Sequence, residues 1–108
     1  MDFKVVMCGC TAMGIDVLNH LLSHNISITH IVSLNEKQSL DWNVSGYSSF
    51  ENISKKHNIP IYFPKSYSLK EPEDVEFFEN QKFDLLILVY SRFCTAYAST
   101  ILHLLNKG

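Results

Sequence analysis

Short apolar runs alternate along the chain with stretches in which apolar residues recur at helical spacing. The runs are five to nine residues long and rich in Val, Ile and Leu, as strands are. Between the first two runs, Val17, Leu18, Leu21 and Leu22 form one helical stripe. The predicted strands are residues 3–8, 26–34, 59–63 and 84–90, and the predicted helices are residues 14–24, 50–58, 73–81 and 96–107.

A regular alternation of strand and helix predicts parallel strands with helices on both faces of one sheet. Right-handed crossovers leave few topologies, and we expect the strand order 3-2-1-4. Pro60 near the start of the third strand favours an edge position. The run 84–90 is continuously apolar, which predicts a strand covered on both faces. The expected fold is therefore a single Rossmann-like α/β domain that spans residues 1–108.

Two segments lie where ligands of such sheets bind, at the carboxyl ends of the first and fourth strands. These are residues 9–14 and residues 90–95. A third segment, residues 35–49, is polar and is predicted to be a long loop. Loops of this length in a compact domain often carry function. Trp42 and Tyr47 in this loop offer aromatic surfaces on which a base could stack, or cover for the sheet edge.

The turn after the first strand resembles two phosphate-binding motifs and completes neither. Gly9 and Gly14 have the outer spacing of G-x-G-x-x-G, but Thr11 replaces the middle glycine. The same glycines match the start of a P-loop, but Ile15 and Asp16 follow where Lys and Ser or Thr are required. Two alternatives remain: the glycines serve the turn and the helix packing, or the helix N-terminus binds an anion without either motif.

Composition and charge exclude several classes of protein. The chain has 108 residues and a formal net charge of −2, and its cationic residues are scattered. General nucleic-acid binding through a basic surface is therefore not expected. Three cysteines do not indicate a disulfide framework. No apolar run is long enough for a membrane span, and no signal peptide is visible, so we expect a cytoplasmic location.

Four stretches in order give the chain its resemblance to a known family. They are KVVMCGCTAMGIDVLNHLL, HNIPIYFPKSYSL, FDLLILVYSRF and ILHLLNKG. Together they resemble the N-terminal part of the catalytic domain of formyltransferases that use formyl-tetrahydrofolate. The stretch SGYSSFENISKKHNIPIY resembles the sugar N-formyltransferases more than the methionyl-tRNA enzymes, which have a basic, Pro-rich loop at this place. The resemblance implies formyl transfer to an amine, most closely that of a nucleotide-linked amino sugar.

The family resemblance also implies which residues meet the ligands. Residues that match the loop around the folate pterin are Tyr90, Ser91, Arg92 and Phe93. Residues that match the acceptor side of the cleft, or lie in the long loop beside it, are Cys10, Thr11, Ala12, Met13, Trp42 and Tyr47. No metal ligand is predicted. Arg92 is the only arginine, and its guanidinium could hold a carboxylate or a phosphate.

The same resemblance implies that this chain alone is inactive. In the family, an Asn-x-His strand and a later Asp carry the chemistry, and the expected position of that strand lies just beyond Gly108. The five histidines are predicted to be structural or exposed. If the chain is the front half of such an enzyme, we expect an apolar sheet edge through which it dimerises or aggregates. The alternative is a non-catalytic module that binds a nucleotide or a partner; a degenerate dehydrogenase is disfavoured by the missing glycine.

Overall fold

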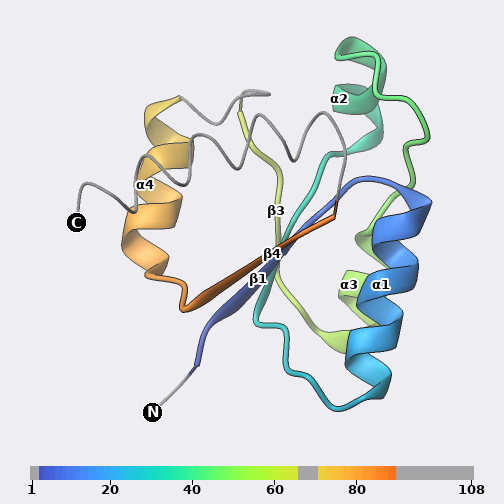
Figure 1. Cartoon of the computed structure of the whole chain (residues 1–108). Helices are drawn as coiled ribbons and strands as arrows, with labels where there is room; N and C mark the ends of the chain where they lie inside the picture. The colour runs from blue at the N-terminus through green and yellow to red at the C-terminus, as the bar shows by residue number, and fades with distance from the viewer. Residues whose placement is uncertain (1–2, 66–70, 90–108) are drawn as a thin grey trace.

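A parallel four-stranded sheet forms the centre of the molecule in the computed structural model, which describes residues 3–65 and 71–89 (Figure 1). The elements in chain order are β1 (Val5–Cys8), α1 (Ala12–Ser23), β2 (His30–Val32), α2 (Glu36–Asp41), α3 (Glu51–His57), β3 (Ile61–Tyr62), α4 (Pro72–Gln81) and β4 (Leu85–Leu88). The predicted helix at residues 96–107 lies outside the described residues.

The strand order is β3-β2-β1-β4, and every neighbouring pair is parallel. Met7 of β1 lies opposite Ile31 of β2 on one side and Ile87 of β4 on the other. The order 3-2-1-4 and the α/β class are therefore confirmed. The pairing of β1 with β4 creates the predicted switch point, because the chain leaves β1 toward α1 and crosses to the other side of β1 only at β4.

Helices cover both faces of the sheet, as the alternation of strands and helices predicts. The cluster on one face contains Val6, Cys8, Cys10, Val32 and Leu34, with Phe77 and Phe78 of α4 packed against it. The cluster on the other face contains Val5, Met7 and Ile31 together with Leu18 of α1 and Phe50 and Ile53 beside α3. Figure 1 shows α4 on one side of the strands and α1 with α3 on the other. Successive β1 residues alternate between the two clusters, as a twofold side-chain period requires.

The prediction of an uninterrupted loop at residues 35–49 is wrong, because α2 lies within it. Asn35 caps this helix: its side chain accepts a hydrogen bond from the backbone N–H of Gln38 at 2.8 Å. The Gln38 side chain accepts one from the backbone N–H of Asn35 at 3.1 Å, which completes a capping box. The segment lacks an apolar stripe, so hydrophobic periodicity could not reveal a helix of six residues.

All four strands are shorter than the predicted ranges, and the second and fourth of these ranges also contain exposed apolar residues. The second strand is shorter than residues 26–34, and Ile26 is exposed, because the chain leaves α1 through the left-handed Asn25 (φ 62°). The prediction that residues 84–90 are covered on both faces is also wrong for β4. Leu85 is 46% exposed and Leu88 is 37% exposed. Within the described residues β4 is an edge strand, which explains why its apolar side chains are less buried than those of β1.

Candidate functional site

The turn after β1 is shaped by packing against Phe50. A Cβ atom added to Gly9 would lie 3.2 Å from Cζ of Phe50, and one added to Gly14 would lie 2.9 Å from the same atom. Phe50 itself is fully buried. Both glycines therefore make room for one aromatic ring between α1 and the sheet, which supports the packing alternative for the two phosphate-like spacings. Helix α1 begins at Ala12, two residues earlier than its apolar period indicates.

The chain after α2 folds back onto this turn. The backbone N–H of Ser48 donates to the carbonyl oxygen of Cys10 at 2.9 Å. Thr11 and Tyr47 form an isolated antiparallel bridge, and the Tyr47 hydroxyl donates to the carbonyl oxygen of Leu34 at 3.0 Å. Residues 42–48 are thus held across the carboxyl ends of β1 and β2. This places Tyr47 beside the turn although 36 positions separate it from Thr11 in the sequence.

The six residues predicted on the acceptor side are brought to this one region, but they present different groups. Cys10 is fully buried, whereas Thr11 is half-buried and makes no side-chain hydrogen bond that caps α1. Ala12 and Met13 are exposed, Met13 by 63%. Trp42 and Tyr47 are half-buried and pack against the cluster that contains Cys10 and Leu34. A ligand here would meet the Thr11 side chain, the first turn of α1 and the half-buried side chains of Trp42 and Tyr47.

Burial and two carboxylates act on the Tyr47 hydroxyl. Burial is the main cause that raises the pKa of Tyr47; a hydrogen bond with the Ser49 side chain opposes it, and the carboxylates of Glu51 and Glu36 raise it further. Tyr47 therefore stays protonated near neutral pH and can donate its hydroxyl hydrogen to Leu34.

The residues predicted to line the folate pocket, Tyr90, Ser91, Arg92 and Phe93, lie outside the described residues. The structure does describe the end of the strand that leads to them. The backbone N–H of Val89 donates to the carbonyl oxygen of Cys8 at 3.3 Å, so β4 stays paired with β1 to its last described residue. Val89 therefore lies beside the turn that begins at Gly9.

Sequence reasoning missed a buried carboxylate at the start of α4. Asp74 is fully buried, and its carboxylate accepts hydrogen bonds from the Tyr62 hydroxyl and from the backbone N–H of Lys65 at 2.9 and 3.0 Å. The Tyr62 ring stacks on Phe77, with centroids 4.1 Å apart. Asp74 is one of two acidic residues in the first turn of α4, a position that complements the helix dipole. No local signal pairs it with a tyrosine twelve positions earlier.

Ser33 follows β2 directly and is fully buried. Its backbone N–H donates to the carbonyl oxygen of Tyr62, but its hydroxyl oxygen has no hydrogen-bond partner among the described residues. The strand register places Ser33 opposite Gly9, since Val32 lies opposite Cys8. A hydroxyl in this state is costly, because burial removes its hydrogen bonds with water.

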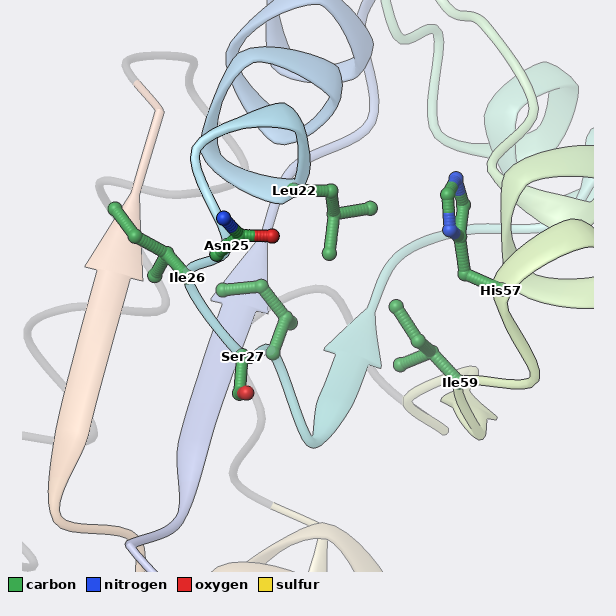
Figure 2. Close-up of a pocket in the computed structure, with 7 residues that line it drawn as sticks. Leu22, Asn25, Ile26, Ser27, His57 and Ile59 are labelled. Carbon is green, nitrogen blue, oxygen red and sulfur yellow. The ribbon is translucent and has the colours of Figure 1, made fainter.

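A shallow cavity of about 340 Å³ lies at the opposite, amino-terminal edge of the sheet. Figure 2 shows Leu22, near the end of α1, on one side and His57, the last residue of α3, on the other; Ile59 follows α3, and Ile28 also lines the cavity. None of the residues predicted to bind a ligand lines it. The carboxyl-edge site and this cavity are therefore separate features of the domain.

The chain matches no protein-family model and no protein of curated function. The resemblance to formyltransferases therefore stays a prediction that rests on the residues. Over residues 3–65 and 71–89, no helix is both long and apolar enough to cross a membrane. The same residues contain no group of three or more His, Cys, Asp or Glu side chains placed to share a metal ion.

Proposed function

We propose that the chain forms part of the catalytic domain of a formyltransferase that uses formyl-tetrahydrofolate, with the amine of a nucleotide-linked amino sugar as acceptor. The fold has the parallel order that such a domain needs, and the resembling stretches fall on β1 with α1, on β3 and on β4. Under this proposal the chain binds the ligands. It does not catalyse formyl transfer by itself, because the family's Asn-x-His pattern is not among its residues.

One observation carries the proposal: the segment after α2 is fastened over the turn that follows β1. The bond from Ser48 to Cys10 and the bond from Tyr47 to Leu34 hold Tyr47 beside the first turn of α1. Trp42, at the end of α2, packs against the same cluster as Tyr47. Two aromatic side chains at the carboxyl edge of a parallel sheet suit the base of a nucleotide, because every base presents a π face for stacking.

The electrostatics of the site support an amine-bearing acceptor. Glu36 and Glu51 place negative charge near the Tyr47 hydroxyl. A cationic amine gains from such surroundings, whereas an unaccompanied diphosphate does not. The first turn of α1 offers backbone N–H groups that would offset part of the phosphate charge. We therefore expect an amino sugar nucleotide to bind more tightly than the corresponding nucleoside diphosphate.

In this proposal the folate binds to the residues that follow β4. The backbone N–H of Val89 donates to the carbonyl oxygen of Cys8, so the last described residue before this segment lies next to the acceptor side of the switch point. In the proposed arrangement, Tyr90, Ser91, Arg92 and Phe93 contribute to the pterin pocket, and the formyl group meets the acceptor between β1 and β4. Arg92 would hold the folate glutamate or an acceptor phosphate by its two-pronged guanidinium.

Tryptophan fluorescence gives a direct test, because Trp42 is the only tryptophan in the sequence. We would titrate the chain with an amino sugar nucleotide, with the matching nucleoside diphosphate and with formyl-tetrahydrofolate. The proposal predicts saturable changes with the first and third ligands. Tyr47→Leu should weaken the first binding by about tenfold, as expected for one lost base stack. Phe3→Leu, an exposed aromatic residue before β1, is the matched control and should have no effect.

The experiment also tests the alternative of a non-catalytic binding module. Met13 and Leu40 favour that alternative, since both are large apolar side chains exposed to solvent, by 63% and 71%. Nucleotide binding without any folate binding would support the module and contradict formyl transfer. Absence of both kinds of binding, with folding confirmed by circular dichroism, would contradict the proposed acceptor site.

A further inference from the structure

Two histidines lie together at the end of α1, far from the candidate site. His20 is in the last turn of the helix and His24 is the residue that caps it. The centroids of their imidazole rings are 4.3 Å apart and the rings are inclined by 39°. Both side chains are exposed. The spacing of four positions places both rings on one face of the helix, one turn apart.

The hydrogen bonds of His24 determine which ring nitrogen carries its proton. Nδ1 of His24 lies 2.9 Å from the carbonyl oxygen of His20, which can only accept, so Nδ1 is the protonated nitrogen of the neutral ring. The Ser23 hydroxyl donates to the same carbonyl and leaves its own oxygen as an acceptor, 3.2 Å from Nδ1. Nε2 of His24 therefore carries the lone pair. A backbone carbonyl that holds one ring N–H in this way is the usual support of a metal-binding histidine.

The surroundings favour a cation. The last carbonyl groups of a helix carry partial negative charge, and both rings lie at the carboxyl end of α1. Asp16 is exposed four positions before His20, so it adds negative charge to the same helix face. Imidazole nitrogen suits copper, nickel and zinc, whereas magnesium and calcium prefer oxygen. An ion bound between the two rings would lie about 2.0–2.1 Å from one nitrogen of each.

We propose that His20 and His24 form a binding site for one divalent transition-metal ion of the copper, nickel and zinc group. The two imidazoles supply adjacent ligands, and water or a group from a partner fills the remaining positions. Its affinity should follow the order Cu²⁺ above Ni²⁺ and Zn²⁺. The bound ion should exchange with solvent and should not be needed for folding, since its two ligands are exposed and belong to one helix end.

The test is a calorimetric titration of the chain with NiCl2, compared with three variants. Wild type should bind one ion per chain. His20→Gln and His24→Asn should each weaken binding by about tenfold or more, because each removes one of the two ligands. His57→Gln removes an exposed histidine near the end of α3 and is the matched control, so its affinity should equal that of wild type. Unchanged affinity in His20→Gln, or loss of binding in His57→Gln, would overturn the proposal.

A second measurement identifies the ligands. The electron paramagnetic resonance spectrum of the Cu²⁺-loaded chain should show two equivalent imidazole nitrogens, and His20→Gln should reduce these to one. His24→Asn also removes a capping contact, so circular dichroism should first confirm that it folds. If it does not, the result for His20→Gln decides, because the His20 ring forms no hydrogen bond with the helix end within the described part of the chain. A copper spectrum without imidazole nitrogens in the wild type would contradict the site.

Discussion

The ring of Phe50 reaches so close to Gly14 that a methyl group there would lie 2.9 Å from its Cζ atom. In folded proteins a Cβ atom essentially never lies this close to a non-bonded carbon atom, so either the helix or the ring would have to move. The ring is fully buried and belongs to the core between α1 and the sheet. The glycine is thus required by an aromatic side chain 36 positions away, and no phosphate is needed to explain it.

We expect Gly14→Ala to lower the free energy of unfolding by about 1 kcal/mol. Alanine in a helix is favoured over glycine by about 1 kcal/mol. Overpacking a buried site costs about 1–3 kcal/mol, and this term should win because Phe50 has little room to retreat. In a Phe50→Leu background the contact disappears, so the same substitution should be neutral or stabilising. Urea unfolding of the four proteins measures both effects; stabilisation in both backgrounds would show that the ring does not impose the glycine.

The strand order could be predicted because apolar runs and helical stripes each report on a whole element. Helix α2 could not be predicted in this way, since its only signal was the spacing of Asn35 and Gln38 in a capping box. The position of Tyr47 beside Thr11 depends on reversals of the chain at the left-handed Asn43 (φ 50°) and Gly46 (φ 71°). Such reversals follow from tertiary contacts, so the sequence could suggest the site residues but not the bonds that assemble them.

His30 should make the domain less stable in mild acid. Burial, and next the positive charge of Lys4, lower the pKa of His30 below its usual value. Its ring lies edge-on to Phe83, with centroids 5.1 Å apart. As the pH falls, the His30 imidazole takes up its proton near pH 6.5 in the unfolded chain and only at a lower pH in the folded protein. The unfolded state therefore binds more protons in this range, and the free energy of unfolding falls as the pH is lowered through it.

The measurement is urea unfolding between about pH 7.5 and pH 5, where a free histidine titrates. His30→Gln should show a smaller loss of stability over this range than wild type. His57→Gln is the control, since His57 is exposed, and its pH dependence should match that of wild type. Parallel curves for His30→Gln and wild type would mean that burial of His30 does not affect its protonation.

Asp74 should contribute more to stability than any other carboxylate in the first turn of α4. Asp74→Asn keeps the size of the side chain but places an N–H₂ group opposite the donors of Tyr62 and Lys65. We expect a loss of about 2 kcal/mol, the range for hydrogen bonds to a charged group. Glu73→Gln removes an exposed first-turn carboxylate and should change stability by less than about 0.5 kcal/mol. Equal effects in thermal unfolding would show that the helix dipole, and not the buried bonds, gives Asp74 its role.

Two buried serines should respond in opposite directions to the same substitution. The Ser54 hydroxyl donates to the carbonyl oxygen of Ile59 at 2.5 Å, whereas the Ser33 hydroxyl has no partner among the described residues. Ser54→Ala should lower the free energy of unfolding by about 1 kcal/mol, because it leaves a buried carbonyl without its donor. Ser33→Ala should raise it by about 1 kcal/mol, since it removes a polar group that burial separates from water.

The pair is well matched, because both side chains are serines with less than a tenth of their surface exposed. Chemical unfolding of the two variants and wild type, under one set of conditions, gives the comparison. A loss of stability in Ser33→Ala as large as that in Ser54→Ala would mean that the Ser33 hydroxyl is satisfied in solution, by a trapped water beside Gly9. That result would also indicate a bound water molecule at the carboxyl end of β2. A ligand at the switch point would have to displace this water.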